Sequence, residues 1–289
     1  MTAQADIAPV ASVRVLHGGF TSELRAIKIV WQRDLIRFAN DRLRMITSLI
    51  QPFAFLFVLG TGLSALTSGS THGVNIRTFM YPGILGMSLL FTALFSAASI
   101  VWDREFGFLR EMLVAPVRRS SIIIGKCFGG ASVAALQGVL VVAVAGLVGV
   151  PYDPVMIIEV IALQLLLAFA LTSLGLAIAV RIKQIQSFMA INQMIVMPLF
   201  FISGALFPVS GLPAWLAVLN RLDPLTYAID PIRHVVFTQL DIAPAARRVL
   251  DPGVTWGGWV VPPILEAGIV LLIGIVLLGA AVAEFSRED

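Results

Sequence analysis

The feature that most constrains this chain is a series of long apolar runs separated by short charged segments. Two of these runs, residues 79–101 and 188–207, contain no charged residue. About 20 residues of α-helix are needed to cross the hydrocarbon core of a bilayer, which is ~30 Å thick. Only 13% of the 289 residues are charged, whereas soluble domains carry about 25%. The chain is therefore expected to be an integral membrane protein built from helices.

We expect six membrane-spanning helices, at residues 45–66, 79–101, 122–150, 155–180, 188–207 and 260–285. Pro52 is expected to kink the first, because proline lacks the backbone N–H of a regular helix. No cleavable signal peptide is expected, since the first apolar run begins near Met45, behind a basic segment. The fold class is therefore all-α integral membrane, with a disordered tail (1–20), an interfacial helix (21–43) and a six-span domain (44–289).

The segment before the first span has the periodicity of an amphipathic helix. Over residues 23–40, apolar side chains recur at spacings of three and four, and Arg and Lys take the other positions. The apolar positions are Leu24, Ile27, Trp31, Leu35 and Phe38. A basic amphipathic helix with tryptophan on its apolar edge is typical of a helix lying in the membrane interface. Packing against a soluble partner is the alternative, and both can hold for a helix between lipid and partner.

Basic residues are divided unevenly between the two sides that these spans define. The segments on the side of both termini carry 15 Lys and Arg residues, and those on the other side carry five. Cytoplasmic loops are enriched in Lys and Arg. We therefore expect a plasma (inner) membrane protein with both termini cytoplasmic, together with the charged segment 102–126. The net charge of +3 has the same origin, so no nucleic-acid partner is expected.

The external segment 208–259 is too apolar for a free loop. Pro213 and Pro231 are each expected near a helix start, where the missing N–H costs nothing. We expect two short re-entrant helices that enter the outer leaflet. Tryptophan and tyrosine are enriched at the membrane–water interface, so four aromatic residues are expected at head-group level. These are Trp215, Tyr227, Trp256 and Trp259.

No catalytic or metal-binding constellation is found in the sequence. The three histidines fall in three separate regions, and the single cysteine, Cys127, excludes a multi-cysteine metal site. Gly125-Lys126 superficially resembles a phosphate loop, but Ser120 replaces the first glycine of that motif and Cys127 its Ser/Thr. Gly125 and Gly129 form a GxxxG pattern, which favours close helix packing. No catalytic residue, metal or cofactor is therefore expected on this chain.

Two carboxylates lie near the outer ends of expected spans, Glu159 in the fourth and Glu266 in the sixth. They can reach toward the interface, which is the favoured interpretation, or belong to a proton relay. No series of carboxylates and bases crosses the membrane, which weakens a proton-coupled mechanism.

The charged segment after the second span is expected to contain a short helix. Phe106, Leu109 and Leu113 recur at spacings of three and four, and Pro116 ends the pattern. Such a helix can lie on the membrane surface. Alternatively, it can be the contact through which a soluble motor moves the membrane part.

Two long stretches resemble the permeases of type-2 ABC exporters, in the daunorubicin-resistance and nodulation-factor-export groups. They are REFGFLREMLVAPVRRSSIIIGK and NQMIVMPLFFISGALFPVSGLPAWLAVLNRLDPLTYAIDPIR, at 104–126 and 192–233. TSLIQPFAFLFVLGTGL, at 47–63, is similar to the first span of that family. The resemblance covers residues 21–285 and is weak at 1–20 and 241–254.

The resemblance implies two permeases, identical or closely related, pairing with two separate ATP-binding subunits that hold ATP and Mg. The segment after the second span would be the coupling helix that docks on the ATP-binding subunit, through Arg104, Glu105, Phe106, Leu109, Arg110, Glu111 and Leu113. The substrate path would lie at the permease dimer interface, lined by spans one, two and five. On these spans we expect Phe91, Phe95, Asn192, Gln193, Met194, Met197, Phe200 and Phe201 to line it.

The predicted function is the permease subunit of an ATP-driven exporter of an amphipathic drug, lipid or glycolipid, working by alternating access. Two other classes stay open on the residues alone. A proton-coupled efflux carrier would depend on Glu159 or Glu266 and need no ATPase. A membrane enzyme acting on lipid would need acid, base or metal ligands facing one surface, and the scattered histidines argue against it.

Overall fold

The computed structural model describes residues 19–67, 75–109, 112, 117–209, 213–240, 242–256 and 258–287. Within these ranges, six helices are long and apolar enough to cross a membrane, which confirms the expected number. They are Met45–Ser64, Ile76–Glu105, Arg119–Val142, Pro154–Ala179, Ile185–Ile202 and Pro263–Arg287. The expected disordered tail falls almost entirely outside the described residues.

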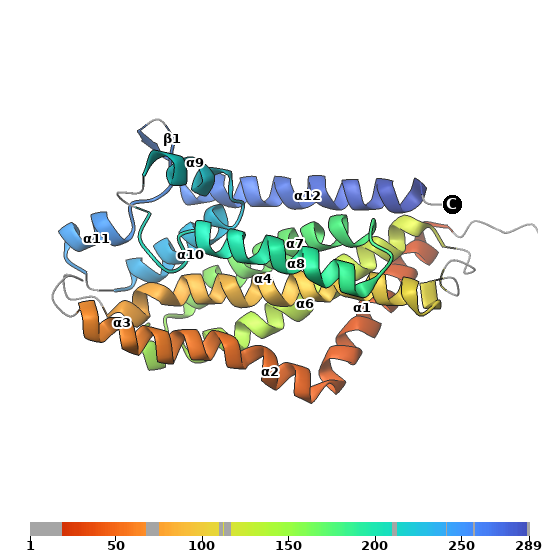
Figure 1. Ribbon diagram of the computed structural model, residues 1–289, viewed down its shortest axis with the longest axis horizontal. Helices are drawn as coiled ribbons and strands as arrows, with labels where there is room; N and C mark the ends of the chain where they lie inside the picture. Colours follow the sequence, from red (N-terminus) through yellow and green to blue (C-terminus); the bar gives the residue numbers. More distant parts are fainter. Residues whose placement is uncertain are drawn as a thin grey trace, which may run out of the picture.

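The chain begins with α1 (Phe20–Asn40), which makes an elbow with the first span at Asp41. That span runs through α2 (Arg42–Phe53), the π-helix η1 (Ala54–Leu59) and α3 (Gly60–Thr67). The π-helix begins two residues after Pro52, which cannot donate a backbone hydrogen bond. The backbone hydrogen bonds change there from the α-helical to the π-helical pattern. Figure 1 shows α1 and the end of α12 (Pro263–Arg287) at one end of the bundle, here called the α1 end.

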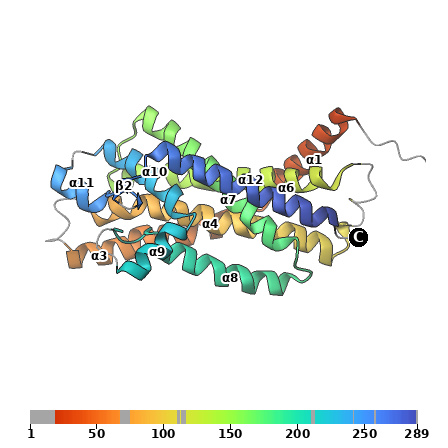
Figure 2. The same cartoon turned by 90° about the horizontal axis from the view of Figure 1, so that it is seen from above.

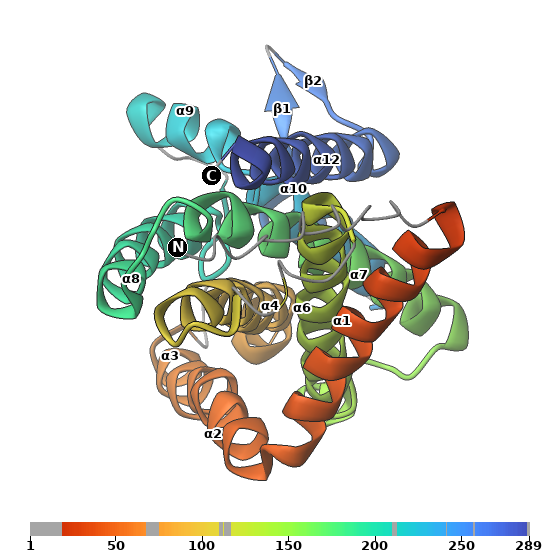
Figure 3. The ribbon, with the colours of Figure 1, turned by 90° about the vertical axis from the view of Figure 1, so that its right-hand side faces the viewer.

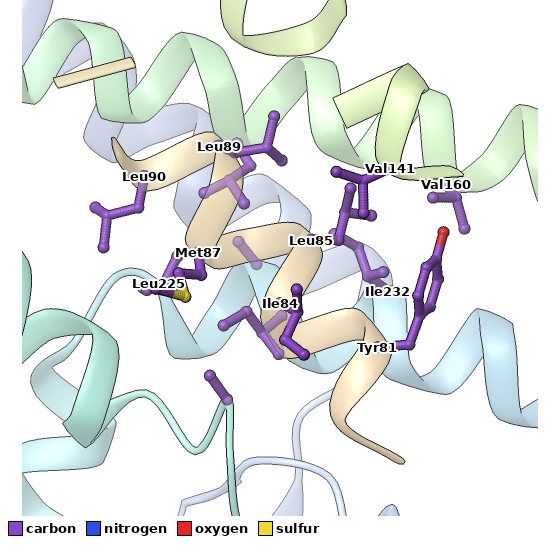
Figure 4. Packing of buried hydrophobic residues seen from close by; sticks show 14 of the residues in the cluster. Tyr81, Ile84, Leu85, Met87, Leu89, Leu90, Val141, Val160, Leu225 and Ile232 are labelled. Carbon is purple, nitrogen blue, oxygen red and sulfur yellow. The ribbon is translucent and has the colours of Figure 1, made fainter. Parts of the chain in front are cut away.

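The second span, α4 (Ile76–Glu105), is the most enclosed helix of the bundle. Around it lie α2, α6 (Arg119–Val142), α7 (Pro154–Ala179) and α8 (Ile185–Ile202), as the end-on view of Figure 3 shows. Its side chains form the centre of the apolar core with residues from α6, α7 and the external segment (Figure 4). Among them are Tyr81, Ile84, Leu85, Leu89, Val141, Val160 and Ile232.

The third span is shorter than expected. The apolar run was expected to remain helical over 122–150, but α6 ends at Val142 and a short 3-10 helix, η2 (Ala145–Val148), follows. Gly149 then adopts φ +82°, a left-handed conformation that glycine takes without steric cost, and the chain turns back toward α7. The Tyr152 hydroxyl donates to the carbonyl of Ala143 at 2.6 Å across this turn. Composition could not separate the turn from the helix, because both are apolar.

The segment between α8 and α12 forms more structure than expected. It contains α9 (Ala214–Leu222), α10 (Thr226–Thr238), α11 (Pro244–Leu250) and an antiparallel hairpin of β1 (Thr255–Trp256) and β2 (Trp259–Val260). Because residues 259–260 pair in this hairpin, the sixth span begins at Pro263 rather than at 260.

Only one of the two expected proline signals marks a helix start. Pro213 directly precedes α9, as predicted, whereas Pro231 lies inside α10. The turn that starts α10 is held by Asp223, whose Oδ1 accepts from the N–H of Leu225 at 2.8 Å. Trp215 is exposed, but Tyr227 is only 5% exposed, because its ring is packed into the core with α10. Tyr227 is thus packed inside the protein, and its position at head-group level stays a prediction.

Candidate functional site

The end of α4 carries three consecutive charged residues, and each is bonded to other helices or to the turn between them. Asp103 contacts two cations from other helices. Its Oδ2 lies 2.6 Å from Lys126 Nζ on α6 and 2.9 Å from Arg33 Nη2 on α1. The Lys126 side chain is 1% exposed, so this ammonium is withdrawn from solvent and paired inside the protein.

The next two residues bind the turn between α7 and α8. Arg104 Nη1 donates to the carbonyls of Val180 at 2.7 Å and Ile182 at 3.0 Å. Glu105 Oε2 accepts from the N–H of Ile185, the first residue of α8, at 2.8 Å. The first N–H groups of a helix have no partner within it, and the helix dipole favours a carboxylate there. The residue before α8, Gln184, makes no side-chain cap, so Glu105 from another helix supplies it.

Beyond Glu105 the chain turns at Gly107, with φ +84°, and presents two aromatic side chains. Phe106 is 69% exposed and Phe108 is 56% exposed. Leu109 is instead buried in the apolar cluster that joins the ends of α4, α6, α7, α8 and α12. Of the expected docking residues, Arg104 and Glu105 thus bind the chain itself and Phe106 is accessible. Arg110, Glu111 and Leu113 lie outside the described residues.

Helix α1 packs closely along α6, as Figures 2 and 3 show. A Cβ atom at Gly125 would lie 2.8 Å from Val30, and one at Gly129 would lie 2.9 Å from Cβ of Asp34. The GxxxG pattern therefore marks close helix packing, as expected. Asp34 is 8% exposed, and burial raises its pKa even though Lys126 and other cations lower it.

Polar contacts hold α1 at both ends of this packed face. Glu23 accepts from the Ser121 hydroxyl at 2.6 Å, and the indole of Trp31 donates to Ser132 at 3.0 Å. The guanidinium of Arg37 lies 5.3 Å from the ring centre of Trp102 on α4. Four of the five expected apolar positions face the bundle at least in part, but Leu24 is 50% exposed.

A cleft of about 220 Å³ lies between residues of α1, α2 and α4. Figure 1 shows that α2 diverges from α4 toward the α1 end. The lining of the cleft is aromatic and uncharged polar: Phe38, Thr47, Ser48, Gln51, Phe91, Thr92 and Phe95. The rings of Phe91 and Phe95 are nearly parallel, with centres 6.4 Å apart. Toward α3, an edge-to-face contact between Phe55 of η1 and Phe200 of α8, with centres 6.1 Å apart, joins the two helices that flank α4.

The structure divides the eight expected path residues into three groups. Phe91 and Phe95 line the cleft. Asn192 and Phe200 are buried on the face of α8 that packs on the bundle. Four residues form the opposite, exposed face of α8: Gln193, Met194, Met197 and Phe201.

Sequence reasoning missed the partners of the buried charges. Lys126 offered a signal, because an isolated lysine in an apolar helix requires a counter-ion. Glu266 was expected to reach the interface, but it is 0% exposed, so that expectation is wrong; Glu159 is exposed. The sequence could not show that α10 folds over Glu266.

Comparison with known proteins places this architecture in a family. Residues 25–237 match the family model described as ABC-2 type transporter. The chain is 29% identical over 230 residues to Nodulation protein J of Rhizobium leguminosarum bv. trifolii, covering 78% of this chain and 85% of that protein. It is 29% identical over 216 residues to the putative transport permease ycf38 of Cyanophora paradoxa, covering 73% and 74%.

The inner membrane transport permease YadH of Escherichia coli K12 is 28% identical over 211 residues, covering 72% of this chain and 82% of YadH. The family match spans well over half of the chain, and it agrees with the resemblance in the 104–126 and 192–233 stretches. Permeases of this family pair with ATP-binding subunits and carry no ATPase domain themselves. This chain therefore belongs to the ABC-2 type transporter family, as a membrane permease subunit.

Proposed function

We propose that this permease, as a pair with itself or a closely related chain, works with two ATP-binding subunits to export an amphipathic drug, lipid or glycolipid. The observation that carries this proposal is the charged end of α4. Asp103, Arg104 and Glu105 bond to α1, α6, the α7–α8 turn and the start of α8. A displacement applied just after Glu105 would reach all of them through charge-assisted hydrogen bonds, which are among the stronger side-chain contacts.

Phe106 and Phe108 are the proposed contact with the ATP-binding subunit. Large exposed aromatic side chains beside a charged rim are typical of the anchors of protein interfaces. Both rings project from the turn at Gly107, immediately after the residues that bind the other helices. ATP binding and hydrolysis in the partner would therefore displace Phe106 and Phe108, and through them the charged end of α4.

The cleft beside α4 is the proposed entry of the substrate path. Its aromatic walls suit an apolar moiety, and its hydroxyl and amide groups suit an uncharged polar one. We propose that the exposed face of α8, with Met194 and Phe201, meets the second permease, and that switching opens the Phe55–Phe200 contact. Exposed methionines form adaptable apolar surfaces, which suits an amphipathic cargo.

The proposed location is the inner membrane, with the α1 end on the cytoplasmic side. The excess of Lys and Arg in the segments at this end supports that orientation. YadH, one of the similar proteins, is described as an inner membrane permease.

The test of coupling is the Phe106→Ala/Phe108→Ala variant, because both side chains are exposed and their loss should leave the fold intact. We expect it to lose co-purification with its ATP-binding subunit, and to lose permease-dependent ATPase activity. Phe128→Ala, which removes a 48% exposed phenylalanine from α6, is the matched control and should retain both. Leu109 is unsuitable for this test because it is buried. Full retention of both properties in the double variant would disprove the docking assignment.

A transport assay in membrane vesicles that contain the permease and its ATP-binding subunit separates this function from a proton-coupled carrier. ATP-driven export should persist after the proton gradient is collapsed. Transport that needs the gradient and no ATP-binding subunit would instead favour the carrier.

A further inference from the structure

At the end of the bundle remote from α1, a glutamate is buried without a hydrogen-bond donor. Glu266 lies in the first turn of α12 and is 0% exposed. Neither of its carboxyl oxygens has a hydrogen-bond partner among the residues that the structure describes. A buried, ionised carboxylate with no donor is strongly disfavoured. Glu266 therefore needs a proton or a cation.

The group beside Glu266 is a second carboxyl. Asp230 on α10 is 7% exposed and lies within hydrogen-bonding reach of the Glu266 side chain. One of its oxygens, Oδ2, accepts from the N–H of Val254 at 3.2 Å. Two ionised carboxylates can only accept hydrogen bonds, so they cannot bond to each other until one is protonated. Burial raises the pKa of Asp230, and this effect outweighs the nearby guanidinium of Arg233.

Each cationic side chain near this pair makes at least one other contact, although Nε of Arg233 and of Arg247 has no hydrogen-bond partner among the described residues. Arg233 is 1% exposed, donates to the carbonyl of Gly204 at 2.6 Å and stacks 4.8 Å from the ring centre of Phe79. It can balance one carboxylate. His234 is bonded to Asp251 at 3.0 Å, and Arg247 donates to the carbonyl of Phe237 at 2.7 Å. Of the neighbouring glutamates, Glu159 on α7 is exposed. No group of three or more His, Cys, Asp or Glu side chains in the described ranges could hold a metal ion.

We propose that Asp230 and Glu266 form a proton-binding site that holds one shared proton and thereby fastens α10 to α12. With the proton present, one carboxyl donates to the other and Arg233 balances the remaining charge. When the proton is lost, two like charges are left in contact in a buried site, and they repel. The α10–α12 seam should then loosen. With the orientation given under the proposed function, on which this step rests, the site lies on the outer side of the membrane. External pH would then set how firmly α10 covers α4 and α7.

The direct test is the infrared absorption of a protonated carboxylic acid, recorded for the purified full-length permease at a pH where exposed carboxyl groups are ionised. We expect a C=O band that shifts in D₂O, is lost in Glu266→Gln and is retained in Glu159→Gln. The glutamine variant keeps the shape of the side chain and can donate to Asp230, so it should fold. A band unchanged in Glu266→Gln, or absent from the unmodified protein, would overturn the proposal.

A second measurement follows the seam itself. Val261→Cys, at a position 2% exposed beside the seam, is introduced with Cys127→Ser and labelled by a membrane-impermeant maleimide. The labelling rate is measured with Glu266 and in the Glu266→Gln background, and the ratio of the two rates is taken. The pH effects of the thiol and of His234 are common to both proteins and cancel in this ratio. We expect this ratio to rise with pH by up to about tenfold per pH unit, the limit for one proton. A ratio that stays constant across the pH range would contradict the shared proton.

Discussion

Removing the carboxylate of Asp103 should destabilise this permease more than removing the ammonium of Lys126. The two groups are 2.6 Å apart, but their other contacts differ. In Asp103→Asn, Lys126 loses its bonded counter-ion and keeps its hydrogen bond to the Ser99 hydroxyl, at 3.1 Å, while its side chain is 1% exposed. Removing one partner of a buried ion pair costs about 3–5 kcal/mol of folding free energy. The Asp34 carboxyl also interacts with Lys126, so we expect a cost near the lower end of that range.

In Lys126→Met, Asp103 keeps Arg33 at 2.9 Å, and the Arg33 side chain is 42% exposed. The loss is then close to that of one hydrogen bond between charged groups, about 1.5–3 kcal/mol. The double variant removes both buried charges and should be more stable than Asp103→Asn alone. The coupling free energy between the two positions must then exceed the cost of Lys126→Met, so we expect about 1.5–3 kcal/mol, the upper part of the usual range for contacting residues.

The assay is a double-mutant cycle on unfolding in mixed detergent micelles, followed by tryptophan fluorescence. Arg33→Gln is combined with Lys126→Met as a further variant. Asp103 then loses both cations, so we expect this combination to be as costly as Asp103→Asn. The reasoning is refuted if Asp103→Asn costs no more than Lys126→Met. It is also refuted if the two costs add without coupling, because the charges would then not share one buried site.

Two further predictions concern α1 and the external segment. Gly129→Ala should cost about 1–3 kcal/mol of folding free energy and weaken α1 packing, because the new Cβ would lie 2.9 Å from Asp34. Gly279→Ala, with nothing within 4 Å, should leave stability unchanged or slightly raised; equal effects in the same unfolding assay would contradict the close packing. The hydrogen bond to Asp251 raises the pKa of His234 above its ordinary 6.5, so this pair's stabilisation should be complete below pH 6.5 and lost as pH rises through the raised value. Thermal unfolding of His234→Gln should lack that decline, and an identical pH profile in the variant would rule it out.

The sequence predicted the helices of this fold better than their ends. A run of 20 apolar residues is a local property, and it was sufficient to find all six spans. The end of α6 at Val142 was missed because the turn that follows is as apolar as the helix. The prediction for Pro231 was wrong because α10 starts just after the Asp223 turn. Pro231 lies inside the helix, five residues after its first residue.

The buried charges mark where local reasoning fails. The GxxxG pattern correctly indicated close packing, because small residues at that spacing have one common use. Nothing in the spacing of Asp103 and Lys126 shows that they meet, since they lie on separate helices joined by a charged segment. Glu266 was assigned to the interface because its position near a helix end allowed it. Only the arrangement of α10 over α12 makes it a buried group.

The capping of α8 by Glu105 has a consequence for chimaeric permeases. Exchanging α7 and α8 between relatives would transplant a helix whose first N–H is bonded to a carboxylate on another segment. The swapped block should therefore include residues 103–105 as well. The exchanged block must therefore begin at those three residues, at the end of α4, rather than at the start of α7. It then includes α6 as one additional span.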